Sequence, residues 1–284
     1  MKELFGLTSA FRILSILPCW GENSSKYGRI LAWSPVVGLV ISLICTIPYV
    51  LFTRLTLCVL LADSPCTEDK CIELFISLLG AVFYVGCEAF LTRGFHLDGL
   101  ADTFDGWGGG WTKENTLKIM RDSHIGSFGT IALIVVLAVK TLGVAVLLYF
   151  SKYVWLIFMP VFSRTLMVGQ AAFNRYAREG ESLAGSVVSD TQPRHAIAAV
   201  IVCIVVGAIV SLIGSFISVK ALHAANIVPT VCLVLGVILT ATIAFISRRR
   251  IEGVTGDVLG ATVELNEALF LWSAALYCCL LAAK

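Results

Sequence analysis

The stretch at residues 125–150, IGSFGTIALIVVLAVKTLGVAVLLYF, decides the fold class. A helix that crosses the hydrocarbon core of a bilayer needs about 20 predominantly apolar residues. This stretch is longer than that and contains a single charged side chain, Lys140. A helix of this length that is apolar on every side is typical of a membrane span. The stretch therefore predicts a membrane-spanning helix.

The rest of the chain repeats this composition. Its 284 residues are 58% hydrophobic and 14% charged, with a mean hydropathy of +0.89, whereas soluble domains carry roughly a quarter charged residues. No internal repeat or linker divides the chain, so we predict one all-α domain over residues 1–284, a polytopic integral membrane bundle of about seven transmembrane helices. The other six expected spans are residues 30–52, 71–91, 153–173, 196–219, 227–246 and 267–283. A net charge of +2 gives no reason to expect a nucleic acid as partner.

The basic residues predict how the bundle is oriented. With seven spans, fourteen of the 21 Lys and Arg residues fall in segments on one side and five fall on the other. Cytoplasmic segments carry the excess of Lys and Arg. Residues 93–124, 174–195 and 247–266 are therefore expected together on the cytoplasmic side of the cell (inner or plasma) membrane.

A cluster of carboxylates follows the second span. Residues 94–110, GFHLDGLADTFDGWGGG, carry Asp98, Asp102 and Asp105 at spacings of four and three, which place them on one face of a helix. Crowded carboxylates repel one another, so this face favours a hard divalent cation with oxygen ligands. The alternative is a solvated acidic helix end. His96 would be a ligand, a general base, or a structural histidine beside that face.

A second acidic face lies near the C-terminus. In GVTGDVLGATVEL, Asp257, Ala261 and Glu264 repeat the same helical spacing. Two acidic faces on one side of the membrane predict a shared metal site, although an ordinary acidic helix end is the alternative. The predicted metal ligands are Asp98, Asp102, Asp105 and Asp257.

Several basic residues are candidates for binding phosphate. Arg164 lies inside an expected span, and an intramembrane arginine usually has a partner or lines a polar cavity. It would hold a phosphate or an aspartate. Arg175, Arg178 and the triple arginine at residues 248–250 would also meet phosphate, with positive-inside topology as the alternative explanation. Asp122, at the end of a polar helix at residues 113–122, belongs either to the site or to a plain helix junction.

These groups together suit phosphoryl transfer at a membrane surface. Carboxylate-bound magnesium would neutralise a pyrophosphate and its leaving group, while arginines stabilise the remaining charge. The sequence has no Walker loop and no Rossmann fingerprint, so ATP hydrolysis and hydride transfer are not expected.

Five blocks of sequence also resemble the cobalamin synthase family, in the family's order and over nearly the whole chain. They are YGRILAWSPVVG, GFHLDGLADTFDG, LKIMRDSHIGSFG, SRTLMV followed by RYAREG, and TGDVLGATVEL. The resemblance implies a membrane transferase of the EC 2.7.8 type that acts late in cobalamin (vitamin B12) biosynthesis. It would use magnesium to join adenosylcobinamide-GDP to α-ribazole or its 5′-phosphate and release GMP. Two positions depart from the family pattern: His124 stands where arginine is common, and Arg93 where glycine is common.

The resemblance also places residues in the site. Carried onto this sequence, it implies roles for Asp98, Asp102, Asp105, Asp122, Arg164, Asp257 and Glu264. Combined with the residue patterns, it gives a catalytic set of Asp98, Asp102, Asp105, His96 and Asp257. The predicted substrate-binding set is Arg164, Asp122, Arg175, Arg178 and Glu264. The lipid bilayer is the expected surrounding, and the sequence leaves a homo-oligomer open.

Two other classes remain as alternatives. A CDP-alcohol phosphotransferase also uses a membrane-embedded aspartate cluster, but the Ala-Arg after its first DG pair and its later GxxxDxxxD are absent from this sequence. A secondary transporter would place Lys140 and Arg164 on its path, but no pair of broken helices stands at matching positions in two halves.

Overall fold

The structure, a computed structural model, describes residues 2–19, 27–61, 70–180, 182–217 and 221–283. These residues form a helical bundle, and their only β-type pairing is an isolated bridge between Tyr176 and Val254. Seven of the described helices are long and apolar enough to cross a membrane, which confirms the predicted all-α membrane bundle. In chain order the helices are α1 (Lys2–Leu14), α2 (Tyr27–Ala32), α3 (Ser34–Leu61), α4 (Lys70–Leu91), α5 (Phe95–Gly109), α6 (Lys113–Ile119), α7 (Ser127–Tyr149), α8 (Tyr153–Ala172), α9 (Leu183–Asp190), α10 (Pro193–Ile217), α11 (Ala221–Ile251) and α12 (Gly256–Ala282).

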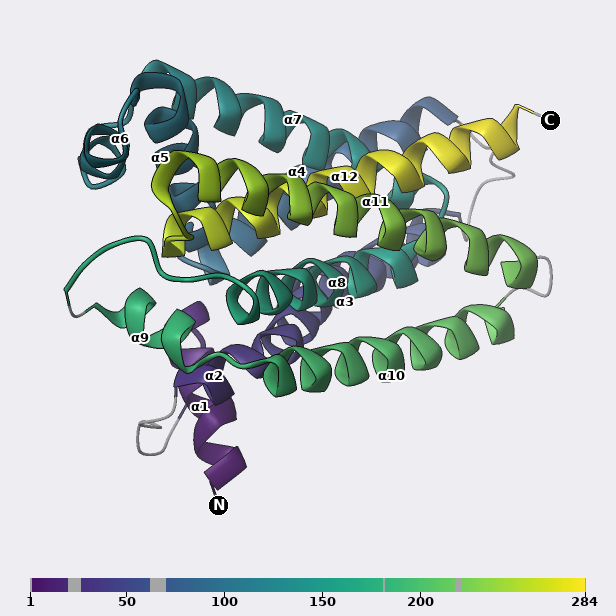
Figure 1. The fold of residues 1–284 in the computed structure, drawn as a ribbon. Helices are drawn as coiled ribbons and strands as arrows, with labels where there is room; N and C mark the ends of the chain where they lie inside the picture. The colour runs from purple at the N-terminus through teal and green to yellow at the C-terminus, as the bar shows by residue number, and fades with distance from the viewer. Residues whose placement is uncertain (1, 20–26, 62–69, 181, 218–220, 284) are drawn as a thin grey trace.

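Two helices, α8 and α12, form the middle of the bundle (Figure 1). Helix α12 packs against α5, α7, α8 and α11, while α8 also packs against α3 and α10. In the span of α8, 72% of the residues are buried, compared with 11% in the span of α10. Helix α10 is therefore peripheral, with most of its apolar surface left for lipid.

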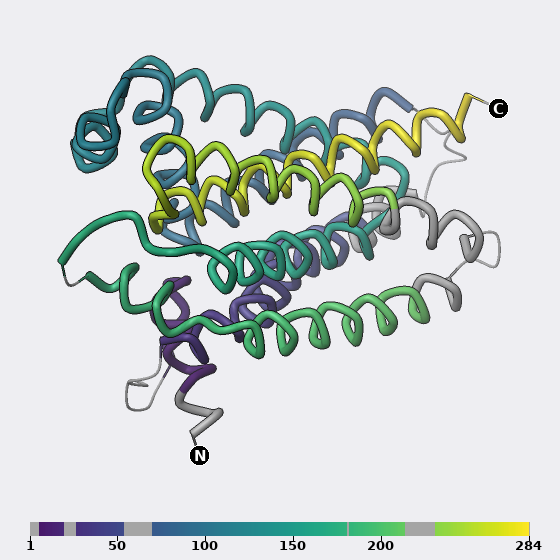
Figure 2. The backbone as a smooth tube through the Cα atoms, viewed as in Figure 1, coloured from purple at the N-terminus to yellow at the C-terminus, as the bar shows by residue number. Residues whose placement is uncertain are grey.

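The three polar segments predicted to share one side of the membrane do meet at one end of the bundle. Figure 1 shows α5, α6, α9 and the α11–α12 connection at that end, and the backbone trace in Figure 2 leads to the C-terminus at the opposite end. Lys113 at the start of α6 pairs with Glu252 at 2.7 Å, and the Arg250 guanidinium donates to the carbonyls of Trp107 and Gly110. These contacts join residues 93–124 to residues 247–266 directly.

Two segments that the sequence predicts as non-helical contain helix in the structure. They are the expected connection at residues 247–266 and the expected loop at residues 174–195. Helix α11 continues to Ile251 and α12 already begins at Gly256, where the Thr255 side chain accepts from the backbone of Val258 as an N-cap. Glu264 lies within α12 because the bundle provides an ionic partner for this polar side chain, as described below. The second segment contains α9 and the start of α10.

Two glycines allow α5 and α12 to lie close together. A Cβ atom at Gly99 would stand 2.8 Å from the backbone oxygen of Asp257, and one at Gly260 would stand 3.2 Å from the Cα atom of His96. Small residues at a contact between membrane helices let the two backbones approach. As a result, α5 presents Asp98 and Asp102 beside the first turn of α12.

Candidate active site

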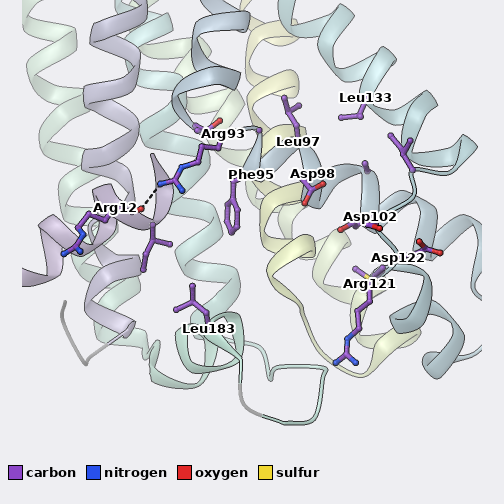
Figure 3. Close-up of a pocket in the computed structure, with 17 residues that line it drawn as sticks. Arg12, Arg93, Phe95, Leu97, Asp98, Asp102, Arg121, Asp122, Leu133 and Leu183 are labelled. Atoms are coloured by element: carbon purple, nitrogen blue, oxygen red, sulfur yellow. Dashed lines mark hydrogen bonds between the residues drawn. The ribbon is translucent and has the colours of Figure 1, made fainter. Parts of the chain in front are cut away.

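A cavity of about 1010 Å³ opens beside α5 at the polar end of the bundle, and we call it the carboxylate cavity (Figure 3). Asp98 and Asp102 line it from successive turns of α5, and Arg121 and Asp122 line it from the segment after α6. Apolar side chains, Phe95 and Leu133 among others, complete its wall. The cavity therefore offers a ligand both charged side chains and apolar surface.

Arg93, where α4 turns into α5, is fixed at the edge of this cavity. Its backbone is left-handed, with φ of 57°, and that of the following Gly94 is also left-handed, with φ of 64°. A residue other than glycine in this conformation is strained. The Arg93 guanidinium donates to the carbonyl oxygens of Arg12, at 3.1 Å, and Ser15, at 2.9 Å. These bonds compensate for the strain and attach α1 to the start of α5.

Asp102 is the most perturbed carboxyl group of the cavity. Burial, together with the negative charges of Asp257 and Asp98, raises its pKa from 3.8 to about 7, while the positive charge of Arg178 opposes this shift. A carboxyl group whose pKa lies near 7 can accept a proton at neutral pH, which suits a general base. The same crowding of negative charge also favours a divalent cation at this place.

Asp257 faces this pair from α12 and is held by an arginine. The Arg178 guanidinium donates to Asp257 Oδ2 at 2.8 Å, and the two side chains are 16% and 22% exposed. The same Nη2 atom donates to the carbonyl of Met120 at 3.2 Å. Arg178, which was predicted to bind substrate, therefore lies beside the predicted metal ligands.

The structure sets Asp105 apart from Asp98 and Asp102. Its two carboxylate oxygens accept from the backbone amides of Gly126 and Gly129, at 2.7 and 2.8 Å, at the start of α7. The first amides of a helix have no partner within the helix and attract negative charge. A Cβ atom at either glycine would collide with the Asp105 carboxylate. Asp105 thus caps α7 and does not line the cavity.

The residues described here contain no group of three or more His, Cys, Asp or Glu side chains in a ready metal-binding arrangement. Magnesium does not need one, because it usually keeps several waters and takes one or two carboxylates together with substrate phosphates. Asp98 and Asp102, with Asp257 nearby, provide that kind of donor set. The residues present therefore fit a magnesium ion that arrives with a phosphorylated ligand.

His96 is turned away from the cavity. It is 2% exposed, and neither ring nitrogen has a hydrogen-bond partner among the described residues. Burial lowers its pKa to about 3, with a further contribution from the positive charge of Arg164. A histidine with so low a pKa is a weak base at neutral pH. This placement favours Asp102 over His96 as the proton acceptor.

The other polar residues predicted for the site lie at its edges. Asp122 is exposed on the cavity wall, where His124 donates to it through its backbone amide and approaches it with Nδ1 at 2.7 Å. These contacts lower the Asp122 pKa.

The three arginines at residues 248–250 each have a partner within the protein. Arg248 donates to the Ala244 carbonyl, Arg249 lies over the Phe245 ring, and Arg250 bonds α11 to the end of α5 as described above.

The family model for cobalamin-5-phosphate synthase matches residues 6–275. The chain belongs to the cobalamin-5-phosphate synthase family. It is 33% identical over 273 residues to the adenosylcobinamide-GDP ribazoletransferase of Prosthecochloris aestuarii, with 96% of this chain and 98% of the relative covered.

Two further relatives of the same name are similarly close. Identity is 38% over 278 residues with the protein from Pelodictyon phaeoclathratiforme and 36% over 281 residues with that from Chlorobaculum tepidum, each covering 96% of both chains. No solved structure matches the chain. In this member of the cobalamin-5-phosphate synthase family, four residues of the HLDGLAD segment line the carboxylate cavity: Leu97, Asp98, Ala101 and Asp102.

This family member also contains a buried ion cluster, formed by Glu88, Lys140, Arg164, Glu264 and Glu267. The Lys140 ammonium contacts a carboxylate oxygen of each glutamate, at distances of 3.0 Å for Glu88, 2.9 Å for Glu264 and 2.6 Å for Glu267. Arg164 reaches Glu267 at 2.8 Å, and every member is at most 4% exposed. The cluster joins α4, α7, α8 and α12 inside the bundle.

The cluster separates Arg164 and Glu264 from the cavity. Both were predicted to bind substrate, and the structure gives each an internal partner, Glu267 for Arg164 and Lys140 for Glu264. The sequence alone does not single out Glu267, because it stands at the start of an apolar segment that predicts a span. Its spacing of three from Glu264 placed it on the same helix face, and this signal could have identified it.

A second cavity of about 750 Å³ lies on the other side of Arg178, and we call it the arginine cavity. It is lined by Arg175 and Arg178 and by several hydroxyl groups, those of Ser182, Ser186, Ser189 and Thr191 among them. Asp190, the one acidic residue among the described residues of its lining, accepts from the backbone amide of Tyr27 at 3.1 Å. In this cobalamin-5-phosphate synthase homologue, Arg175 and Arg178 therefore share a basic, hydroxyl-rich cavity.

Proposed function

We propose that this chain is an adenosylcobinamide-GDP ribazoletransferase. It joins adenosylcobinamide-GDP to α-ribazole or α-ribazole 5′-phosphate, giving adenosylcobalamin or its 5′-phosphate, and releases GMP. The observation that carries the proposal is the placement of Asp98 and Asp102 on the wall of the carboxylate cavity, beside Asp257 and Arg178. Membership of the family supports the choice of substrates.

The reaction forms one phosphorus–oxygen bond and breaks another. The ribose 3′ hydroxyl of the acceptor attacks the phosphorus attached to cobinamide, and the bond from that phosphorus to the oxygen of the GMP phosphate breaks. Asp102 accepts the hydroxyl proton, since its pKa of about 7 is matched to that step. Asp98 and Asp257 would hold magnesium with it. The bound ion would neutralise the pyrophosphate and the departing GMP.

The carboxylate cavity suits the larger substrate. Its volume of about 1010 Å³ and its mixture of Phe95 and Leu133 with charged groups fit a bulky ligand that carries a pyrophosphate. Arg121 lies on the same wall as Asp122 and can meet a phosphate oxygen there. Arg93 is already bonded to carbonyl groups, so it shapes the cavity edge.

We place the polar end of the bundle in the cytoplasm and the protein in the cell (inner or plasma) membrane, on the excess of Lys and Arg at that end. Single cysteines at Thr112 and Ser182, in a cysteine-free background, test this orientation. Both should resist an impermeant thiol reagent in intact cells and react after permeabilisation. Labelling of either in intact cells would reverse the orientation.

Nucleotide release tests the reaction itself. Purified protein is given adenosylcobinamide-GDP with α-ribazole 5′-phosphate in one reaction and a CDP-alcohol with an alcohol acceptor in another. GMP release in the first reaction alone is expected, and it should disappear in Asp98→Asn. CMP release would instead point to a CDP-alcohol phosphotransferase, and release of neither nucleotide would favour the transporter.

A further inference from the structure

The two cavities meet at one side chain, Arg178. This residue lines the arginine cavity, while its Nη2 atom donates to Asp257 beside the carboxylate cavity and to Met120, which lines that cavity. A ligand in one cavity and a ligand in the other would therefore both lie close to the same guanidinium group.

The arginine cavity has the chemistry of a phosphate site. Arg175 and Arg178 bring two permanent positive charges around a volume of about 750 Å³. The hydroxyls of Ser186 and Ser189 can add donors, whereas those of Ser182 and Thr191 already donate to Tyr176 and to the Val187 carbonyl. Arginine binds phosphate through paired N–H groups. Among the lining residues that the structure describes, two cations face one carboxylate, that of Asp190, which already accepts from the backbone amide of Tyr27. Asp190 therefore does not neutralise both arginines.

The bond between Arg178 and Asp257 competes with such a ligand. Arg178 offers five N–H donors, of which the Nη2 group is used by Asp257 and Met120. Its buried Nε finds no acceptor among the described residues. A phosphate in the arginine cavity can satisfy that Nε and draw the guanidinium away from Asp257.

Loss of Arg178 would change the carboxylate cavity directly. Asp257 is close enough to Asp98 and Asp102 for its charge to raise the pKa of Asp102, and Arg178 opposes that effect. When the guanidinium moves, Asp257 loses its only ion-pair partner in the described part of the chain. The acidic face then has one more unpaired carboxylate with which to hold a cation.

We propose that Arg178 couples the two cavities: a phosphate group bound in the arginine cavity withdraws Arg178 from Asp257, and the released carboxylate strengthens cation binding beside Asp98 and Asp102. This inference rests on the proposed function for the identity of the acceptor, α-ribazole 5′-phosphate. Coupling of this kind is reciprocal and typically changes each affinity by about 5-fold to 150-fold. In this way the cation would be held tightly only when the acceptor is in place.

The test is metal binding without turnover. Manganese, as a paramagnetic substitute for magnesium, is titrated into full-length protein in lipid nanodiscs, and free Mn²⁺ is read by electron paramagnetic resonance. The titration is repeated with α-ribazole 5′-phosphate, with unphosphorylated α-ribazole, with GMP and with inorganic phosphate. α-Ribazole 5′-phosphate should tighten Mn²⁺ binding about tenfold, inorganic phosphate less so, and α-ribazole not at all. Tightening by GMP alone would assign the cavity to the donor nucleotide and overturn its assignment to the acceptor.

Two variants separate coupling from a general charge effect. In Arg178→Gln, Mn²⁺ should bind tightly without any added ligand, and α-ribazole 5′-phosphate should add nothing. Arg249→Gln removes an arginine at the same end of the bundle that contacts Phe245 and lines neither cavity, so it should keep the full tenfold response. If Arg178→Gln still shows the tightening, the coupling does not pass through Arg178.

The unmodified protein provides a test that no folding defect can obscure. By reciprocity, Mn²⁺ should raise its affinity for α-ribazole 5′-phosphate by the same factor. Equal affinities with and without Mn²⁺ would overturn the coupling. Since neither titration involves turnover, a protein that releases GMP but shows no coupling would refute this inference alone. Coupling without GMP release would instead count against the proposed function.

Discussion

The chain contains two groups of charged side chains that look alike in the sequence and differ in their surroundings. In the buried ion cluster, Lys140 contacts three glutamates and Arg164 pairs with one of them, and every member is hidden inside the bundle. Around the carboxylate cavity, Asp98 is exposed, Asp102 is half-buried, and Arg178 is the cation paired with Asp257.

This difference indicates which carboxylates are free to do chemistry. Buried charges that satisfy one another are held in place, and removing one partner leaves the others uncompensated in a medium of low dielectric constant. Asp98 and Asp102 lie close together on one helix face and have access to solvent, so they can take up a cation or a proton. We therefore expect substitutions in the cluster to lower stability, and substitutions in the cavity to lower activity.

The largest effect is expected from Lys140→Met. It removes the ammonium group shared by Glu88, Glu264 and Glu267, and breaking a buried ion pair in this way costs about 3–5 kcal/mol. Thermal unfolding in detergent measures the loss, with Lys118→Met as the control because Lys118 is exposed on α6. Equal unfolding temperatures for the two variants would show that the cluster does not hold the helices together.

The next effect is on turnover. Asp98→Asn keeps the size of the side chain and removes its charge, so GMP release should fall by about a hundredfold or more, and added magnesium should restore part of it. Stability should be retained, since repulsion on the acidic face is relieved. Combining it with Asp102→Asn should add little further loss, because the two residues act as a unit. Glu114→Gln, on the exposed side of α6, is the control, and an Asp98→Asn rate within about threefold of the parent would reject the cavity as the active site.

A change of pH should have a smaller effect, on stability and on cation affinity. The Asp102 pKa is raised from 3.8 to about 7, so the folded protein binds a proton that the unfolded chain has lost. Between these two values stability should decrease as pH rises, while protons should compete with a cation as pH falls below about 7. Mn²⁺ affinity should drop about fivefold between pH 7 and pH 6 through this group. In Asp102→Asn the same titration should be flat over that range, and an unchanged slope would assign the proton to another residue.

The smallest effect is expected for Asp105→Asn. The amide side chain keeps one oxygen for the amides of Gly126 or Gly129 and loses the negative charge at the start of α7. We expect a loss of about 1–2 kcal/mol in unfolding free energy and GMP release within about threefold of the parent. A hundredfold loss of turnover with unchanged stability would return Asp105 to the metal site.

Much of the fold could be predicted because its determinants are local. The length and apolarity of each span predicted seven membrane helices, and the distribution of Lys and Arg predicted that the polar segments share one end. The boundary near residue 256 was wrong because Glu264 and Asn266 look like loop residues unless their partners are known. Those partners, Lys140 on α7 and Thr240 on α11, are distant in sequence, so the helical spacing did not reveal them.

The sequence predicts candidate site residues, and the structure adds how they are arranged. Helical spacing placed Asp98, Asp102 and Asp105 on one face, but a face of a helix in a bundle meets more than one neighbour. Asp105 meets the first turn of α7, whereas Asp98 and Asp102 meet a cavity. Only tertiary contacts distinguish a capping carboxylate from one that is free to bind a ligand.

Helix α12 carries members of both charged groups, and its length between them is fixed as a consequence. Asp257 lies in its first turn, and Glu264 follows seven residues later, close to two full turns at 3.6 residues per turn. Inserting or deleting one residue between them would rotate one group by about 100° about the helix axis relative to the other. Among related sequences, length variation should therefore be absent between these two positions and should collect in the connections at the far end of the bundle.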